Sequence, residues 1–179
     1  SPWHKQQRLL RQVLTAGGCS EAITYSFTDR TAALPFVDDE NDLVNIANPL
    51  SEKYTVLRPS LIPGLLDSLI HNRRRERRDI RLFEIGKRFR QSTDEISGAA
   101  IIITGVGTAE HWSAKDRLVD FFDMKGIVER LCDALGVAPR FETIDSSILV
   151  SGRAAQVSAL PPDTTTPVPL GVFGQLKPS

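Results

Sequence analysis

The stretch DIRLFEIGKRFRQSTDEISGAAIIITGV, residues 79–106, decides the fold class. Its two ends, residues 79–90 and 98–106, have the apolar content of β-strands, and the segment between them is short and polar. The unbroken apolar run from Ala99 to Ile103 predicts that the second strand is buried on both faces. The sequence therefore predicts two neighbouring strands joined by a short turn.

Three segments repeat apolar residues at the spacing of an amphipathic helix. They are residues 1–18 with Trp3, Leu10, Val13 and Leu14, residues 60–76 with Ile62, Leu65, Leu66, Leu69 and Ile70, and residues 120–136 with Met124, Ile127, Val128, Leu131 and Leu135. Ser60 is placed to cap the second helix, and Pro63 fits its first turn. Asp120 and Asp123 stand where the third helix begins, and helix capping explains these carboxylates without acid–base catalysis.

The second of these helices gives a prediction about stability. Its buried face is expected to carry Leu65, Leu66 and Leu69. Truncation of a buried leucine leaves a cavity, so Leu66→Ala should cost about 2–5 kcal/mol, whereas Arg75→Ala at the exposed end should cost little.

The remaining segments supply strands in an irregular order. In residues 21–27, Ile23, Tyr25 and Phe27 alternate with polar residues, which predicts a half-buried strand. Further strands are expected at residues 43–47, 140–150, 154–160 and 169–176. Because helices and strands do not alternate regularly, a doubly wound parallel sheet is not expected. The sequence predicts an α+β fold in which an antiparallel β-sheet is flanked by helices.

Length and composition fit one globular domain. The chain has 179 residues, 41% of them hydrophobic, which is enough for the core of a single domain spanning residues 1–179. No run approaches the roughly 20 apolar residues that span a bilayer, and no signal peptide is present, so no membrane association and a cytoplasmic protein are expected. The absence of a first methionine and the ending on strand-like residues indicate a piece excised from a longer chain. Cys19 and Cys132 have no CxxC partner and are interpreted as structural thiols.

The positive charge is concentrated in HNRRRERRDIRLFEIGKRFR, residues 71–90, which contains nine cations and three carboxylates. The surplus is local, because the whole chain has 22 basic and 22 acidic residues. An RNA-binding patch is expected to interleave aromatic residues for base stacking, and none occurs between Arg73 and Arg81. Two roles therefore stay open: a solvated helix end or subunit contact, and a contact with the RNA backbone. The residues concerned are Arg73, Arg74, Arg75, Arg77 and Arg78.

No motif in the sequence indicates an active site. His4, His71 and His111 occur without an HExxH pattern or a neighbouring cluster of metal-ligating residues. The GxSxG elbow and the phosphate-binding GxxxxGK[ST] loop are absent, and Gly105-Val106-Gly107 lacks the third glycine of a dinucleotide site. We therefore expect no catalytic, cofactor-binding or metal-binding residue in this domain.

Five segments occur in an order that is more specific than any one of them. They are GGCSEAITYSF (17–27), NPLSEKYTVLRPSLIPGLLDSLIHN (48–72), RLFEIGKRF (81–89), DFFDMKGIVERLCDALG (120–136) and GVFGQLKP (171–178). Together they resemble the catalytic-like core of the beta subunit of bacterial phenylalanyl-tRNA synthetase. The resemblance implies a class II aminoacyl-tRNA synthetase-like fold in a subunit that does not itself carry out aminoacylation. It also implies a heterotetrameric enzyme in which the alpha subunit charges tRNA(Phe), with ATP and magnesium bound outside this domain.

The same resemblance allows a comparison with a working class II site. In such sites an arginine on the first strand of a hairpin holds the ATP α-phosphate, and an acid on the second strand orients the substrates. Arg90 stands at the place of the arginine, but Ser97 stands about where the acid is expected, with Glu95 as the alternative. The third motif would lie beyond Ser179, and VSGRAA (150–155) keeps only half of a His-Pro-Gly-Arg-like turn of the family. We expect the isolated chain neither to bind ATP nor to form an aminoacyl-adenylate.

A scaffold without catalytic groups is expected to work by pairing with the alpha subunit. The interface candidates come from one mixed apolar and polar segment and are Asn48, Leu50, Tyr54, Leu57, Arg58 and Leu61. Arg58 either makes a bidentate contact with the partner or pins the loop to its own domain. Two other functions stay open: an active class II ATP-dependent ligase, and a free-standing RNA-binding module that uses Arg73 to Arg81.

Overall fold

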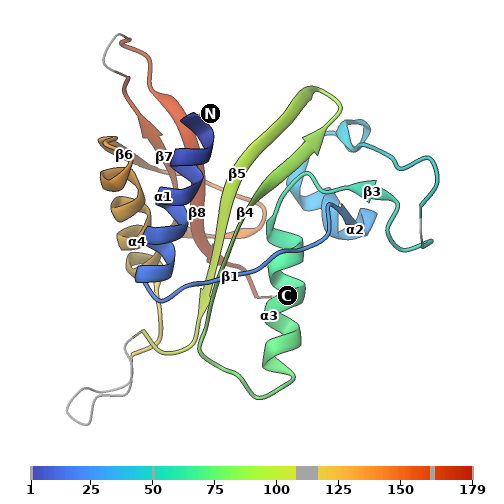
Figure 1. Ribbon diagram of the computed structural model, residues 1–179, viewed down its shortest axis with the longest axis horizontal. Coiled ribbons are helices and arrows are strands. Elements are labelled where there is room, and N and C mark those ends of the chain that lie inside the picture. The colour runs from blue at the N-terminus through green and yellow to red at the C-terminus, as the bar shows by residue number, and fades with distance from the viewer. Residues whose placement is uncertain (1, 50, 108–116, 162–163, 179) are drawn as a thin grey trace. The chain divides into compact units, whose positions relative to one another are not determined.

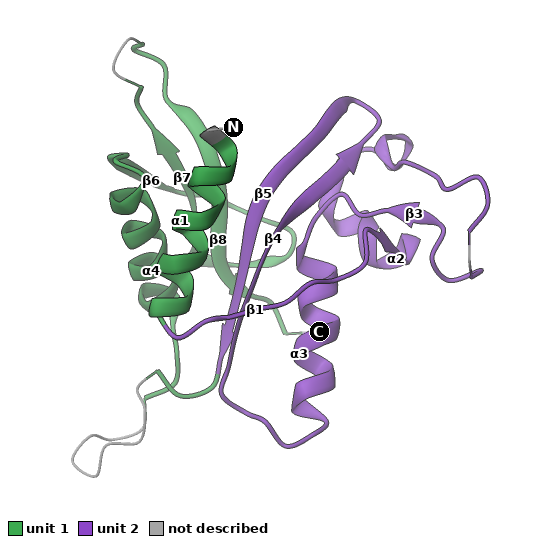
Figure 2. Ribbon diagram, viewed as in Figure 1, with its two compact units in different colours: residues 1–17, 105–179 green, residues 18–104 purple. Residues whose placement is uncertain are grey.

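The computed structural model describes residues 2–49, 51–107, 117–161 and 164–178 and divides into two compact units. Unit 1 contains residues Ser1–Gly17 and Gly105–Ser179, and unit 2 contains residues Gly18–Thr104 (Figure 2). Among the described residues, no helix is both long enough and apolar enough to cross a membrane. The α+β class predicted from the sequence is confirmed, since most strand pairs are antiparallel and helices accompany them.

Unit 2 is built on the predicted hairpin, formed by β4 (Ile80–Arg90) and β5 (Thr93–Thr104) (Figure 1). Its strands pair antiparallel from Ile80↔Thr104 to Arg90↔Thr93, and a short strand, β1 (Ser20–Glu21), pairs parallel with β4. The hairpin is longer than predicted, because β5 begins at Thr93. The prediction that β5 is buried on both faces is wrong. β5 is an edge strand, Ala99 is exposed, and within the run from Ala99 to Ile103 only Ile102 is buried.

Helix α3 (Ile62–Arg73) packs against β4 and β5, in agreement with the predicted helix. The prediction that Ser60 is the N-cap is wrong: the N-cap is Leu61, which makes no side-chain capping bond, and Ser60 lies one residue earlier, where its Oγ accepts a hydrogen bond from the backbone N–H of Ile62 at 3.2 Å. The buried face is rotated from the prediction. Leu65 is completely buried, whereas Leu66 and Leu69 are half-buried. The largest cavity-forming substitution in this helix is therefore at Leu65.

The predictions of short strands at residues 21–27 and 43–47, before α3, are wrong. Residues 22–26 are irregular, and only the pairs flanking them belong to strands, β1 and β2 (Phe27–Thr28). Residues 43–47 contribute a single bridge, Asn45↔Val56, rather than a strand. The partner of β2 is β3 (Val56–Leu57), which the sequence pattern did not indicate. One helical turn, α2 (Arg30–Ala33), and two 3₁₀ helices (Leu34–Phe36 and Glu40–Asp42) complete the unit.

Unit 1 pairs an antiparallel sheet with two helices. The strands are β6 (Pro139–Thr143), β7 (Leu149–Ala159) and β8 (Val168–Leu176), in the order β6-β7-β8. The helices are α1 (Pro2–Ala16) and α4 (Phe121–Ala134), which lie against each other, and α4 also packs on β8. Phe121 of α4 stacks on Phe173 of β8 with ring centroids 5.1 Å apart, and Cys132 is buried in the same cluster. The sequence expected a turn around Gly152, but Gly152 lies within β7 with φ of 74°, at an irregularity in the pairing with β8.

The acidic pair at the start of α4 forms a capping box, as the sequence predicts. The Asp120 side chain accepts hydrogen bonds from the N–H groups of Phe122 (2.8 Å) and Asp123 (3.2 Å). The Asp123 side chain returns the contact by accepting from the N–H of Asp120 at 2.7 Å. Arg117 also donates two hydrogen bonds to the Asp123 carboxylate, at 2.7 and 2.8 Å.

This capping box should make stability depend on pH. The hydrogen bonds from Arg117 lower the pKa of Asp123 from 3.8 to about 2. The charged carboxylate is therefore favoured in the folded state, and its contribution is complete above pH 3.8 and is lost as the pH falls towards 2. We expect Asp123→Asn to lower the free energy of unfolding by about 1 kcal/mol at pH 6 and by much less at pH 2. Urea denaturation of both proteins at several pH values measures this difference, and a difference independent of pH would contradict the assignment.

Candidate partner-binding surface

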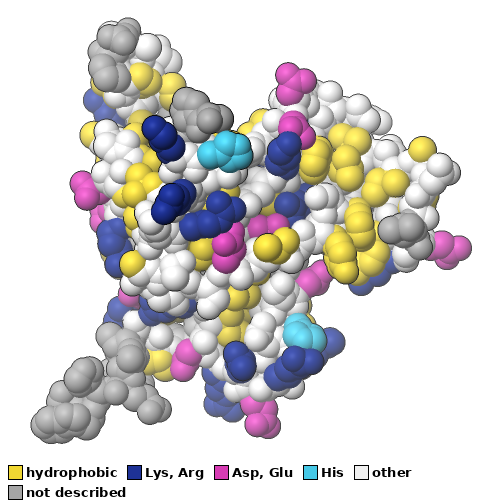
Figure 3. All heavy atoms as spheres, in the orientation of Figure 1, with side chains coloured by type: hydrophobic (Ala, Val, Ile, Leu, Met, Phe, Trp, Pro, Cys, Tyr) yellow, Lys and Arg dark blue, Asp and Glu magenta, His cyan; other side chains and the backbone are white. Residues whose placement is uncertain are grey.

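Unit 2 carries a group of large apolar side chains, here called the aromatic surface, which consists of the exposed Ile23 and Tyr25 and the half-buried Phe27 and Tyr54. Ile23 is 91% exposed and Tyr25 is 72% exposed. The rings of Tyr25 and Phe27 stack with centroids 4.9 Å apart, and the ring of Tyr54 lies 5.5 Å from that of Phe27. Figure 3 shows hydrophobic side chains gathered on the part of this face formed by α2 and β3. Groups of apolar side chains at a protein surface often mark interaction sites.

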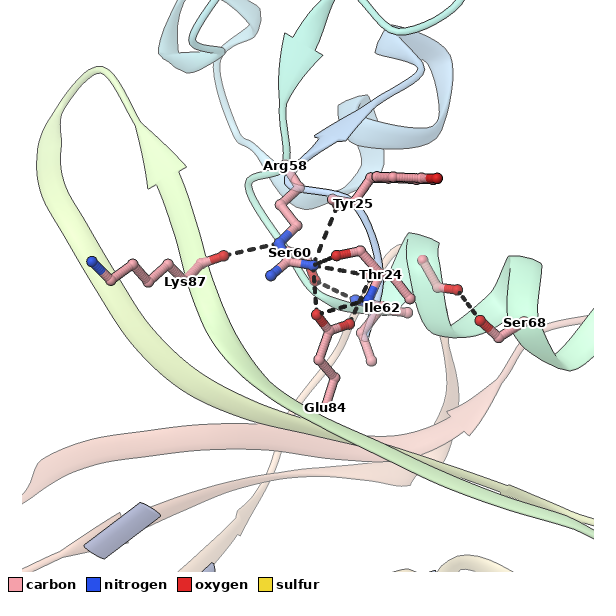
Figure 4. Close-up of polar contacts among 9 residues, drawn as sticks. Thr24, Tyr25, Arg58, Ser60, Ile62, Ser68, Glu84 and Lys87 are labelled. Carbon is pink, nitrogen blue, oxygen red and sulfur yellow. Dashed lines mark hydrogen bonds and ion pairs between the residues drawn. The ribbon is translucent and has the colours of Figure 1, made fainter. Parts of the chain in front are cut away.

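The exposure of Ile23 and Tyr25 reverses the prediction for residues 21–27. The polar residue between them, Thr24, is turned towards the protein and bound there by Glu84. Thr24 donates from its backbone N–H to Glu84 Oε1 (3.3 Å) and from its hydroxyl to Glu84 Oε2 (2.7 Å) (Figure 4). Because neighbouring side chains in an extended segment point in opposite directions, binding Thr24 inward turns Ile23 and Tyr25 outward.

Arg58 fixes the same segment from a second direction (Figure 4). Arg58 is only 5% exposed, and its guanidinium forms an ion pair with Glu84, itself 3% exposed, through Nη1 and Oε1 at 2.7 Å. Nε donates to the carbonyl of Lys87 at 2.9 Å, and Nη1 lies 3.3 and 3.4 Å from the carbonyls of Thr24 and Tyr25. The backbone N–H of Arg58 donates to the carbonyl of Ser26 at 2.9 Å. Three successive carbonyls of the loop are thus held by one residue.

Two glycines leave the space that this network occupies. A Cβ atom at Gly86 would lie 2.6 Å from Arg58 Nη2. A Cβ atom at Gly64, in the first turn of α3, would lie closer still to the hydroxyl of Thr24. At both distances the neighbouring atom would have to shift, so a side chain at residue 86 would displace the Arg58 guanidinium and one at residue 64 would displace Thr24.

The six interface candidates from the sequence differ in their exposure in the structure. Asn48 is exposed, Tyr54 and Leu57 are half-buried, and Leu50 lies outside the described residues. Arg58 and Leu61 are buried, so neither belongs to an exposed surface. Of the two roles left open for Arg58, its contacts are those of the intrachain pin. Ile23 and Tyr25 were missed, and the signal that could have found them is Glu84, an acid within an apolar strand that requires a buried partner.

The residues compared with a nucleotide site are engaged with their own chain. Arg90 Nη2 donates to the carbonyl of Phe36 at 2.7 Å, and Nη1 lies 3.8 Å from Asp42 Oδ2. Glu95 forms an exposed ion pair with Lys87, and Ser97 lies opposite Lys87 in the ladder. Across the hairpin, Arg90 lies opposite Thr93 in the ladder.

The other singled-out residues lie apart from the aromatic surface in sequence. The five arginines of residues 73–78 are exposed on the turn after α3. His4 and His71 are exposed, and His111 lies outside the described residues. Cys19 and Cys132 are buried and not in a disulfide, and burial raises the pKa of Cys132. Within the described ranges, no group of three or more His, Cys, Asp and Glu side chains could hold a metal ion.

The architecture defines a class of protein. The chain is similar to a pyrrolysyl-tRNA synthetase from Desulfitobacterium hafniense, with a TM-score of 0.63 and 17% identity over 90% of this chain and 53% of that one. A second structure of pyrrolysyl-tRNA synthetase from the same organism gives a TM-score of 0.63 and 16% identity, over 89% of this chain and 55% of that one. At this identity the likeness concerns the fold alone, and the fold is that of a class II aminoacyl-tRNA synthetase.

The chain belongs to the family of the phenylalanyl-tRNA synthetase beta chain CLM domain, whose family profile matches residues 1–179. It is 34% identical over 157 residues to the phenylalanine–tRNA ligase beta subunit of Staphylococcus saprophyticus, which covers 85% of this chain and 20% of the relative. The beta subunit of Dehalococcoides mccartyi is 37% identical over 177 residues, covering 96% of this chain and 21% of the relative. The resemblance seen in the sequence is confirmed, and the chain spans about a fifth of the length of these relatives.

Proposed function

We propose that residues 1–179 form a single non-catalytic domain that supports the alpha subunit of a cytoplasmic phenylalanine–tRNA ligase. The observation that carries the proposal is the aromatic surface, which is exposed although a buried ion pair holds its loop in one conformation. In this proposal Ile23, Tyr25 and Tyr54 contact the alpha subunit. The alpha subunit charges tRNA(Phe), and ATP and magnesium bind elsewhere in the enzyme.

Rigid presentation supports this assignment. Binding costs free energy when loops and side chains become ordered, and a loop that is already held avoids much of that cost. The carbonyls of Thr24, Tyr25 and Ser26 are tied to Arg58, so the aromatic surface is ordered before a partner arrives. Tyrosine is also a residue type that concentrates binding energy at interfaces. A loop without a binding partner would need neither the bonds from Arg58 nor an exposed tyrosine.

The absence of catalysis from this domain is a separate part of the proposal. Adenylate formation requires positioned charges on both sides of the transferred phosphate. Arg90 is committed to Phe36 and Asp42, and Glu95 to Lys87. Amino-acid-dependent pyrophosphate exchange by the purified beta subunit alone would overturn this part and favour the active-ligase alternative.

Substitution of Tyr25 tests the surface. In the full-length beta subunit, Tyr25→Ala should weaken association with the alpha subunit by about 2 kcal/mol, or roughly thirtyfold in Kd. The fold should persist, because the side chain is exposed. The matched control is Leu170→Ala, which removes an apolar side chain 51% exposed on β8 and should leave the Kd unchanged. The Kd is obtained by diluting the alpha–beta complex and measuring the mass of the species present. The melting temperature of each variant shows whether its fold persists.

Hydrogen exchange gives an independent test of the same surface. Amides in residues 22–28 and around Tyr54 should become protected when the alpha subunit is added. If Tyr25→Ala assembles as well as the unmodified subunit and these amides show no added protection, the aromatic surface is not the contact.

A further inference from the structure

A second surface of unit 2 has no role in the proposal above. It is the last residue of α3 and the turn that follows, with the sequence RRRERR at residues 73–78, here called the arginine turn. All five arginines are exposed, and Figure 3 shows basic side chains gathered where α3 ends. Because the whole chain carries equal numbers of basic and acidic residues, this local surplus is not a consequence of overall composition.

The backbone of the arginine turn is ordered by hydrogen bonds. The N–H of Glu76 donates to the carbonyl of Arg73 at 3.0 Å, and the N–H of Arg77 donates to the carbonyl of Asn72 at 3.2 Å. This pair of bonds is the Schellman motif that ends many helices, with its central residue in the left-handed region. Glu76 occupies that position with φ of 64°, and among the described residues no other non-glycine residue has a positive φ. The arginines therefore extend from a fixed turn.

The arginines of the turn have no acidic partner within the described part of the chain. Two other cations of unit 2 do have one: Arg30 pairs with Glu40, and Lys87 pairs with Glu95. The side chains of the five arginines form neither an ion pair nor a hydrogen bond with any described residue. Their donors are open to an external anion, and no intrachain contact must be broken before it binds.

The arrangement of the side chains selects the kind of anion. Arg73, Glu76 and Arg78 line a shallow hollow. Guanidinium groups match phosphate oxygens through paired N–H donors, and several neighbouring arginines suit a chain of phosphates. A protein interface needs an apolar centre, but residues 71–79 contain no apolar side chain. Base stacking needs aromatic rings, and none occurs between Arg73 and Arg81.

We propose that the arginine turn binds the phosphate backbone of RNA, without recognising its bases. The identification of that RNA as tRNA rests on the proposed function of the whole enzyme. Glu76 lies in the hollow as the one negative charge, so it weakens binding rather than contributing to it.

Salt dependence of binding tests the inference. The assembled alpha–beta enzyme would be titrated with fluorescent tRNA and with an unrelated RNA duplex at several NaCl concentrations. Replacing Arg73 and Arg78 together with alanine should reduce the slope of log K against log salt by about 2, one for each phosphate contact. The loss should be similar for both RNAs, because backbone contacts carry no sequence information. Glu76→Gln should strengthen binding of both.

Controls separate this inference from the proposed function. Arg8→Ala combined with Arg140→Ala removes two exposed arginines outside the turn and should leave the slope unchanged. Assembly with the alpha subunit, followed by size-exclusion chromatography, should be the same for every variant. An unchanged slope in the Arg73/Arg78 variant, with assembly intact, overturns the inference and leaves the proposed function standing. Loss of assembly in that variant, or a turn that binds polyglutamate but not RNA, overturns it in favour of a protein contact.

Discussion

Replacing Glu84 with alanine is expected to lower the free energy of unfolding by about 3–5 kcal/mol, because the substitution leaves Arg58 charged and buried without a counter-ion. Both side chains are almost fully buried, and 2.7 Å separates Arg58 Nη1 from Glu84 Oε1. Glu84 also accepts two hydrogen bonds from Thr24, which would lose their acceptors. Chemical denaturation of the two proteins measures the difference.

Two comparisons separate burial from charge in this experiment. Glu95→Ala removes one partner of an exposed ion pair in the same unit and should cost only about 0–1 kcal/mol. The double variant Arg58→Met with Glu84→Leu removes both buried charges and should be more stable than Glu84→Ala alone. A loss for Glu84→Ala no larger than that for Glu95→Ala would show that the buried pair does not hold the loop.

Leu65→Ala should lower the free energy of unfolding by about 2–5 kcal/mol, through the lost burial and the cavity left between α3 and the hairpin. Leu65 is 0% exposed, and α3 packs on β4 and β5. Leu66 is half-buried, so its truncation should cost less than that of Leu65. Arg75→Ala, on the exposed turn, should change stability by no more than about 0.5 kcal/mol. Equal melting temperatures for the Leu65 and Leu66 variants would show that the helix face has been misplaced.

The parts of the fold that could be predicted are those with local causes. Helix α4 follows from its apolar spacing and from the Asp120–Asp123 box, and the β4–β5 hairpin follows from two apolar segments around a short polar one. The buried face of α3 could be placed only to within one position, because its leucines are adjacent and the packing partner selects among them.

The aromatic surface was not predicted because its cause is distant in sequence. Residues 21–27 have the period of a strand, but alternation does not say which set of side chains points inward. Glu84, 60 residues from Thr24, makes that choice by binding a hydroxyl and a backbone N–H. The two roles open to Arg58 were likewise separated only by its contact with Glu84, 26 residues away.

The two glycines beside the ion pair couple positions that are distant in this sequence. A methyl group at residue 86 would lie 2.6 Å from Arg58 Nη2, so alanine there requires the end of the Arg58 side chain to move. A methyl group at residue 64 meets the same obstacle in Thr24. Changes at residues 86 and 64 are therefore expected to cost less stability in a chain that is already changed at residues 58 and 24.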